Sequence, residues 1–120
     1  MPPYDTIKKR RDFLRANRGK RYVTPGFILL ASKRAGDDAQ PRLGITVTKK
    51  IGNAVIRNRM KRRFRALAQQ MLPDLGQRGI DYILIGRAGG IEREFAEMRS
   101  DLKRGLKKVN GKLQERQHSA

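Results

Sequence analysis

The sequence predicts an α+β fold, a two-layer α-β sandwich in which helices cover one sheet in the order α-β-β-β-α-β-α. Apolar residues recur every three or four positions over residues 53–72 and again over 91–109, which is the period of a helix with one buried face. Short apolar stretches lie before and between these segments and are typical of strands. A chain of 120 residues has room for one such core. We therefore expect a single domain over residues 1–120, with loose tails at about 1–6 and 110–120.

The first element is a short helix within KKRRDFLRANRGK, residues 8–20. We expect it to end near Gly19, because glycine is favoured just after a helix C-terminus. A strand is expected over residues 25–33, with opposite faces formed by Phe27, Leu29 and Ala31 and by Ile28 and Leu30.

The next strand is expected over residues 42–49, where apolar and small or polar residues alternate. Its inward side would carry Leu43, Ile45 and Val47, and its outward side Gly44, Thr46 and Thr48. Residues 80–87 are apolar on both faces at their centre, which predicts a strand in the middle of the sheet.

Two longer helices follow from the periodicity. The first has an apolar stripe formed by Ile56, Met60, Phe64, Leu67 and Met71. Asn53 is placed to cap its start after a turn at Gly52, and Pro73 is expected to end it. The last helix has a stripe formed by Ile91, Phe95, Met98, Leu102, Leu106 and Val109.

The charge of the chain is strongly one-sided. The formal net charge is +18, and residues 1–73 hold 19 Lys or Arg against 4 Asp or Glu. No acidic residue occurs from 39 to 73. A surface of one sign implies a polyanionic partner, and nucleic acid is the usual one.

Other classes of protein fit the composition poorly. The absence of cysteine excludes disulfides and thiolate metal sites, and it suits the cytoplasm. No apolar run is long enough to span a bilayer, and the N-terminus has no apolar region of a secretory signal, so we expect no membrane partner.

The charge is densest in KKIGNAVIRNRMKRRFR, residues 49–65, where eight of seventeen residues are basic and none is acidic. At 100° per residue, the side opposite the apolar stripe carries Asn58, Arg62, Arg65 and Gln69, with Arg59 and Arg63 on one flank and Arg57 and Lys61 on the other.

A solvated helix face is one interpretation, but such a face normally relieves repulsion with acidic residues four positions away, and this one has none. Arginine offers a planar donor fork to phosphates, and Asn58 can both donate to and accept from a base edge or a 2′-hydroxyl. Lys49, Lys50 and the free N–H groups at the helix start would add a small anion site.

This segment closely resembles the signature of the bacterial ribonuclease P protein subunit, a family with an R-N-R motif on a basic helix. The resemblance extends further, because IKKRRDF is similar to the family's opening L-K-K-x-x-D-F, RLGITVTKK to the strand before the motif and DYILIGR to the last strand. It implies a sandwich of ribosomal-protein type with a left-handed β-α-β crossover through the basic helix, where pattern alone favours the right-handed one.

The resemblance also implies a function. The chain would be the protein component of an endoribonuclease, binding a catalytic RNA and the 5′ leader of precursor tRNA, while the RNA uses Mg²⁺ to remove the leader. No catalytic residue, tightly bound cofactor or obligate protein partner is then expected for the chain itself. The expected surface for the catalytic RNA comprises Lys49, Lys50, Asn53, Arg57, Asn58, Arg59, Lys61, Arg62 and Arg65.

A second surface is expected to bind the leader in a cleft on the sheet. Phe13 matches a family aromatic on the first helix, whereas Asn17 and Leu30 stand where the family often has aromatics. Lys8 and Lys9 would supply charge at the edge of this cleft. The alternative for Phe13 is plain core packing.

Two other functions are alternatives to this one. An independent protein enzyme is disfavoured, because the only histidine is His118 in a predicted tail and the acids Glu92, Glu94, Glu97 and Asp101 read as the polar face of the last helix. A ribosomal or generic RNA- or DNA-binding protein is compatible with the composition, since positive charge gives affinity for any nucleic acid and does not indicate which one is bound. Only the motif resemblance separates it from the ribonuclease P subunit.

Overall fold

The computed structural model describes residues 4–118, with side chains described through residue 114. Its strands are β1 (Asp5–Thr6), β2 (Lys20–Val23), β3 (Phe27–Lys33), β4 (Arg42–Thr46) and β5 (Ile80–Gly86). Its helices are α1 (Arg10–Ala16), α2 (Ala54–Leu75) and α3 (Phe95–His118), with short 3-10 helices at Lys49–Ile51 and Ala88–Gly90. The predicted order α-β-β-β-α-β-α is confirmed from α1 onward, and β1 precedes it.

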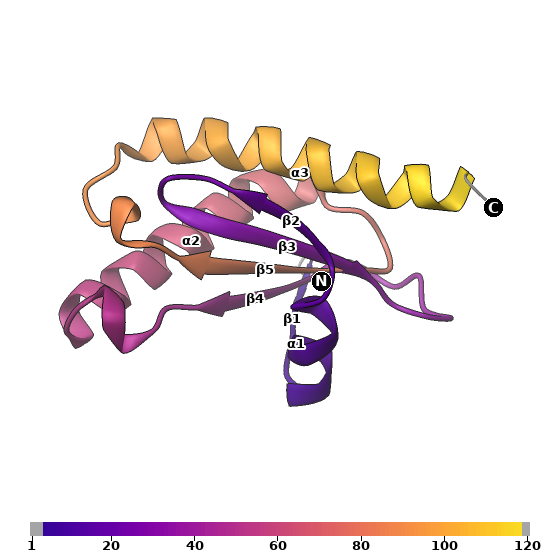
Figure 1. The fold of residues 1–120 in the computed structure, drawn as a ribbon, viewed down its shortest axis with the longest axis horizontal. Coiled ribbons are helices and arrows are strands. Elements are labelled where there is room, and N and C mark those ends of the chain that lie inside the picture. Colours follow the sequence, from indigo (N-terminus) through magenta and orange to yellow (C-terminus); the bar gives the residue numbers. More distant parts are fainter. Residues whose placement is uncertain (1–3, 119–120) are drawn as a thin grey trace.

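The strands form one sheet in the order β1-β4-β5-β3-β2 (Figure 1). β5 lies at its centre, parallel to β4 and antiparallel to β3, as the apolar run over residues 80–87 predicted. The connection from β4 through α2 to β5 is therefore a β-α-β crossover. Its left-handed sense stays an expectation drawn from the family.

The main core lies between the sheet and the pair α2 and α3, which cover the same face (Figure 1). Met60, Phe64 and Leu67 of α2 are buried here, as the first apolar stripe predicted. Met98, Leu102 and Leu106 of α3 are buried here as well, as the second stripe predicted. The rings of Phe27 and Phe64 meet edge to face, with their centroids 5.9 Å apart. Each fully buried large apolar side chain contributes about 1.5–3 kcal/mol, so these stripes hold both helices on the sheet.

The opposite face of the sheet carries α1, which makes the sandwich three-layered at this end. A smaller cluster of Ile7, Ala16, Leu30 and Ile83 is buried there. Gly44 points to this face as predicted, yet it is buried, because the Phe13 ring packs on it. A Cβ on Gly44 would lie 2.6 Å from that ring, so the close approach of α1 requires glycine.

Several element boundaries differ from the predicted ones. α1 ends at Ala16, and the amide of Gly19 then donates to the Ala16 carbonyl in a turn. Pro73 lies inside the last turn of α2, where its missing N–H removes one hydrogen bond without stopping the helix. α3 begins at Phe95 rather than at Ile91, and it follows a segment in which Gly89 and Gly90 lie close to the backbone of residues 25–26.

The predicted loose tails also differ from the structure. Asp5–Thr6 pairs with β4, and the amide of Ile7 donates to the Leu43 carbonyl at 2.9 Å. α3 continues through residues 110–118 to His118. The rest of the predicted tails, residues 1–3 and 119–120, lies outside the described residues.

A buried ionic network fastens α1 to the sheet. Asp81 of β5 is 0% exposed and accepts hydrogen bonds from Arg34 at 2.7 Å and from both Nε and Nη2 of Arg42 at 2.7 Å. Arg15 of α1 reaches Asp81 at 3.4 Å and Asp12 at 2.7 Å. Burial alone would raise the pKa of Asp81, but the hydrogen bonds from Arg42 and Arg34 outweigh it and lower that pKa. The position of α1 therefore depends on charge as well as on apolar contact.

Candidate nucleic-acid interface

The start of α2 is shaped by local sequence. Gly52 has φ 156° and ψ −165°, a backbone conformation that only glycine adopts readily. The Oδ1 atom of Asn53 then accepts a hydrogen bond from the Ile56 amide at 3.0 Å, which confirms the predicted cap. Lys49 and Lys50 are exposed just before this helix N-terminus. Two cations and the unpaired N–H groups of the first turn thus meet at one end of α2.

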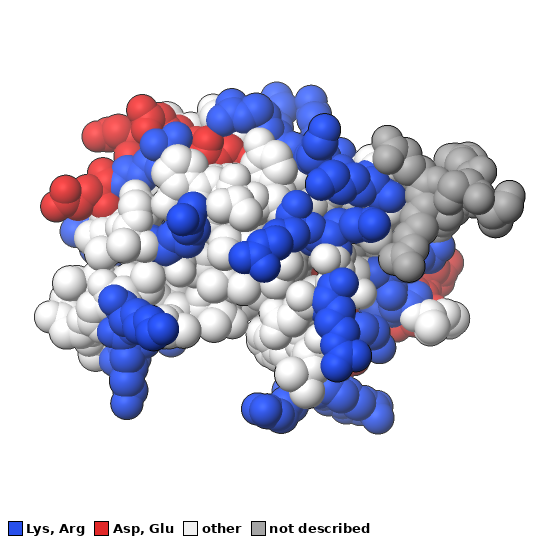
Figure 2. Space-filling model, viewed as in Figure 1, with Lys and Arg blue, Asp and Glu red and all other residues white. Residues whose placement is uncertain are grey.

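The outer face of α2 matches the helical wheel. Asn58, Arg59, Arg62 and Arg65 are exposed, whereas Arg57 and Lys61 are half-buried. None of the basic residues on α2 forms an ion pair within the described residues. Acidic side chains gather instead over the start of α3, at the upper left of Figure 2. The charge of α2 is therefore left uncompensated by the other described residues.

Arg63 differs from the other arginines of α2, because backbone carbonyls accept hydrogen bonds from its guanidinium. Its guanidinium donates to the carbonyls of Gly90 at 2.9 Å and Ile91 at 3.5 Å, and also to that of Arg93. These bonds tie α2 to the segment between β5 and α3. Arg63 therefore has a structural role that its neighbours Arg59 and Arg62 do not share.

Two hollows flank the outer face of α2. One, of about 460 Å³, is lined by Val55, Arg59, Arg62, Arg63, Ala66 and Phe95. Val55 is 74% exposed, so an apolar surface stands beside two unpaired guanidinium groups. Such a combination can contact both an unstacked base and a phosphate.

The other hollow, of about 280 Å³, joins α2 to α1 around the edge of the sheet. Its lining includes Tyr4, Phe13, Gly44, Arg65 and Gln69. It opens where β1 stops covering β4, because β1 pairs only with Arg42 and Leu43. The basic helix and the predicted leader cleft are thus adjacent, which the sequence had not indicated.

The residues predicted to bind the leader differ from one another in solvent exposure. Lys8, Lys9 and Asn17 are exposed, and Phe13 is half-buried at the rim of the second hollow. Leu30 is only 3% exposed, because α1 covers it, so its predicted place on the leader surface is corrected. Sequence reasoning missed Tyr4, whose only signal was an aromatic residue a few positions before the first helix.

Two acidic residues of α3, Glu97 and Asp101, form ion pairs with arginines of the same region. Asp101 is buried, 2.8 Å from Arg93 and 2.8 Å from Arg104, and Glu97 lies 3.1 Å from Arg93. Within the described residues, no group of three or more His, Cys, Asp or Glu side chains could hold a metal ion. The side chain of His118 lies outside the described part. Among the helices that the structure describes, none has the length and apolarity needed to cross a bilayer.

Comparison with known proteins decides the family. A family model described as Ribonuclease P matches residues 1–110. The chain belongs to the ribonuclease P protein family. The ribonuclease P protein component of Erythrobacter litoralis is 58% identical over 103 residues, which cover 86% of this chain and 84% of that protein.

Solved structures of ribonuclease P proteins agree with the fold. The protein from Thermotoga maritima superposes with a TM-score of 0.73 at 30% identity, covering 88% of this chain and 97% of the other. A mutant of the Staphylococcus aureus protein gives a TM-score of 0.74 at 30% identity, covering 88% and 87%.

Membership in the ribonuclease P family confirms the role that the R-N-R segment predicted, a protein component of an endoribonuclease whose catalysis resides in RNA. It sets aside both the independent protein enzyme and the generic ribosomal-type RNA-binding protein.

Proposed function

We propose that the outer face of α2 binds the catalytic RNA of ribonuclease P, and that α1 with the adjoining sheet edge holds the 5′ leader of precursor tRNA. The observation that carries this proposal is the uncompensated charge of α2, in which Arg59, Arg62 and Arg65 are exposed and unpaired within the described residues. Like charges placed together raise the free energy of the folded state, and a bound polyanion removes that cost.

The flank of α2 near α3 suits the catalytic RNA. Arg59 and Arg62 border the hollow with Val55 and Phe95, so phosphate contacts and an apolar contact to a splayed base are both available there. Asn58, between two arginines, is exposed and can bind a base edge or a 2′-hydroxyl. The Oδ1 atom of Asn53 is engaged in the helix cap, which leaves its amide N–H donors for RNA.

The other flank of α2 suits the leader. Arg65 and Phe13 line one hollow although they belong to α2 and α1, so a single strand there would meet a phosphate ligand and an aromatic ring together. Tyr4 lines the same hollow and supplies an aromatic ring where the chain lacks those expected at Asn17 and Leu30. The exposed Lys8 and Lys9 add positive charge near the start of α1.

The chemistry belongs to the partner RNA in this proposal. Mg²⁺ bound by that RNA would supply the Lewis acid and the activated water for hydrolysis of the phosphodiester. The residues of this chain would position the leader relative to the RNA, by phosphate contacts and stacking. This processing would take place in the cytoplasm.

The proposal is tested by comparing the affinity of the reconstituted RNA–protein complex for precursor and mature tRNA. We expect the protein to tighten binding of the precursor much more than that of the mature tRNA. Phe13→Ala should reduce this difference, since a stacked base contributes roughly 1–3 kcal/mol.

Tyr22→Ala is the matched control, because Tyr22 is a partly buried aromatic that packs against the main core on the opposite face of the sheet. Circular dichroism tests whether both variants are folded. A folded Phe13→Ala protein with an undiminished preference for the precursor would refute the leader assignment.

A further inference from the structure

The surface charge changes sign along α3. The helix begins beside exposed glutamates, whereas residues 99–112 hold six Lys or Arg and one acid, Asp101. Asp101 is buried and paired with Arg93 and Arg104, so it does not reach the other cations. Figure 2 shows this change, with acidic side chains at the upper left and basic ones further along the top. The later part of α3 therefore has a basic outer face.

Three of these cations form one row. Arg99, Lys103 and Lys107 are exposed and four positions apart, so neighbours in the row are about 6 Å apart along the helix axis. Lys103 and Lys107 form no ion pair within the described residues. Arg99 donates to Gln70 of α2 through its Nε atom at 2.9 Å, which leaves both Nη groups for a ligand. Like charges four positions apart destabilise a helix, so this arrangement favours an external anion. We call these three residues the α3 basic row.

The α3 basic row is offset from the basic part of α2. Both helices cover the same face of the sheet and run parallel, because three contacts follow the same order along both: Arg63 with residues 90–93, Gln70 with Arg99, and Leu75 with Asn110. Eight residues separate Arg62 from Gln70, and eight separate Arg99 from Lys107. Arg62 and Lys107 are therefore offset by about 24 Å along the helix axes.

The surface between the two basic parts is mostly uncharged. A hollow of about 290 Å³ lies there between α2 and α3, and its lining includes Gln70, Ser100 and Lys103. Asp74 is the one acidic residue among its described lining residues. Amide and hydroxyl groups such as those of Gln70 and Ser100 can bond to a 2′-hydroxyl or a phosphate oxygen. A single RNA element can therefore cross from α2 to the α3 basic row without meeting a large acidic patch.

The α3 basic row has no means of holding an unstacked base. The sequence contains no aromatic residue from 99 onward. The large apolar side chains that are exposed in the described part of the chain are Leu14, Val23 and Val55, all outside α3. Proteins that bind single strands combine cations with aromatic stacking, whereas double-stranded RNA is bound through phosphates and 2′-hydroxyls across its wide, shallow minor groove. The row therefore fits a paired stem better than an unpaired strand.

We propose that the α3 basic row binds the sugar-phosphate backbone of a double-stranded stem of the catalytic RNA, while the outer face of α2 holds another part of the same RNA. The inference rests on the proposed function of α2. Two contacts about 24 Å apart fix the orientation of the RNA on the protein, which one contact alone does not do. The exposed glutamates at the start of α3 repel RNA from the corner between them, which limits the path that the stem can take.

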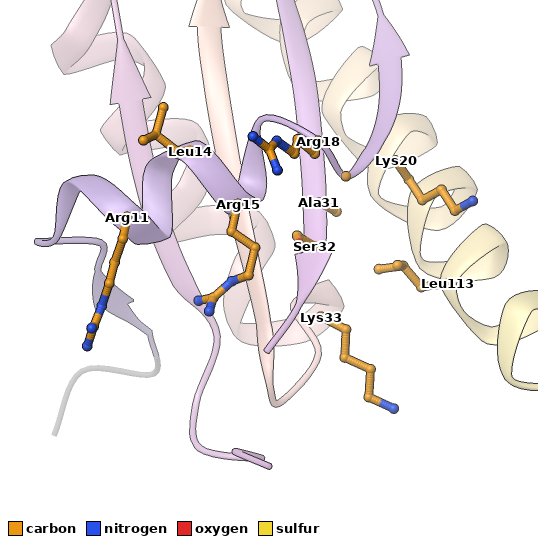
Figure 3. Close-up of a pocket in the computed structure, with 10 residues that line it drawn as sticks. Arg11, Leu14, Arg15, Arg18, Lys20, Ala31, Ser32, Lys33 and Leu113 are labelled. Atoms are coloured by element: carbon orange, nitrogen blue, oxygen red, sulfur yellow. The ribbon is translucent and has the colours of Figure 1, made fainter. Parts of the chain in front are cut away.

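The first test measures the affinity of the protein for the catalytic RNA alone, without tRNA, at several salt concentrations. The variant Lys103→Ala with Lys107→Ala removes two cations of the row. Arg10→Ala with Arg11→Ala is the control, because both arginines are exposed on α1, on the opposite face of the sheet. Figure 3 shows Arg11 projecting away from α3. Circular dichroism tests whether each variant is folded.

We expect the control to keep the wild-type salt dependence and the α3 variant to lose part of it. Each phosphate contact to a duplex contributes about 0.9 to the slope of log K against log salt, so two lost contacts lower it by about 1.8. The advantage of the wild type over the α3 variant should then be about twelvefold smaller at 200 mM than at 50 mM salt. Equal slopes in the α3 variant and the control would overturn the inference, as would a loss that is seen only when tRNA is added.

A second test asks whether the bound RNA is paired. The chain contains no cysteine, so Ser100→Cys gives a single attachment point on the outer face of α3 and keeps every cation. An iron chelate attached there cleaves the RNA backbone nearby. We expect cuts in both strands of one stem. Cuts confined to unpaired RNA, or none beyond those of an untethered chelate, would overturn the inference.

Failure of the inference can be distinguished from failure of the proposed function by a third variant, Arg59→Ala with Arg62→Ala. Weaker RNA binding by this variant together with wild-type binding by the α3 variant would overturn the inference alone. Wild-type binding by the Arg59→Ala with Arg62→Ala protein would instead overturn the proposed function on which the inference rests.

Discussion

The ionic network under α1 gives a stability prediction that follows directly from the distances. Asp81 is 0% exposed, and Arg34, whose side chain is 4% exposed, lies 2.7 Å from it. Asp81→Asn keeps the shape but removes the negative charge, which leaves Arg34 and Arg42 together without their main counter-ion. Breaking a buried ion pair on one side costs about 3–5 kcal/mol, a large share of the roughly 5–15 kcal/mol of a typical domain.

The measurement is the free energy of unfolding in urea, followed by circular dichroism. Asp37→Asn is the matched control, since Asp37 lies 3.0 Å from the same Arg34 but its side chain is 46% exposed. Solvent screens the Asp37 pair, so its loss should be much smaller. If Asp81→Asn costs no more than Asp37→Asn, the network does not fasten α1 and the reasoning fails.

The pH dependence of this difference has a defined sign. The folded-state pKa of Asp81 is lowered, so its contribution is fully present above the unfolded pKa of about 3.9 and is lost as the pH falls through the folded value. The gap in stability between the wild type and Asp81→Asn should therefore be constant near neutral pH and shrink below about pH 4. A gap that instead widened in acid would contradict the lowered pKa.

Three further predictions concern other parts of the chain. Arg63→Ala should destabilise the fold by about 2–3 kcal/mol in urea unfolding, because it removes charged hydrogen bonds to the loop before α3. Arg62→Ala should weaken RNA binding without destabilising the fold, because it removes one of several like charges on α2. Equal losses of stability in the two variants would refute this division. Tyr82→Phe should lower the free energy of unfolding in urea by about 1–3 kcal/mol, because the Tyr82 hydroxyl donates to Asn110 at 2.7 Å and accepts from the Gln77 amide at 3.0 Å. An unchanged unfolding midpoint would mean that these two hydrogen bonds do not stabilise the fold. A short oligonucleotide at a hundredfold excess over its dissociation constant should stabilise the folded state by about 2.7 kcal/mol, and so raise the melting temperature by roughly 10 °C at constant ionic strength. A melting temperature that does not change during the titration would mean that the basic surface is not a preformed site.

The sequence predicted the outer face of α2 because everything needed lies within one segment. The helical period, the cap at Asn53 and the run of arginines are all local, so a wheel places Arg62 and Arg65 on the solvent side without tertiary information. The central place of β5 followed in the same way, from an apolar run on both faces.

The features that escaped prediction depend on contacts between distant segments. Asp81 lies 39 and 47 positions from Arg42 and Arg34, and no period in the sequence joins them. The burial of Leu30 follows from where α1 docks, and the hollow shared by Phe13 and Arg65 follows from the short β1, which leaves the edge of β4 open. Arg63 looks like its neighbours in sequence and differs only because a loop far along the chain presents its carbonyls.

The most direct test of the central claim is the Mg²⁺ concentration that a ribonuclease P RNA needs to cleave precursor tRNA, measured with and without this protein. Wild-type protein should lower that concentration. The variant Arg59→Ala with Arg62→Ala, shown to be folded by circular dichroism, should need a higher protein concentration to do the same. Its salt slope for binding the RNA should fall by about one for each lost phosphate contact. A wild-type protein that leaves the Mg²⁺ requirement unchanged, or a variant that matches the wild type at every protein concentration, would contradict the assignment of α2 as the surface for the catalytic RNA.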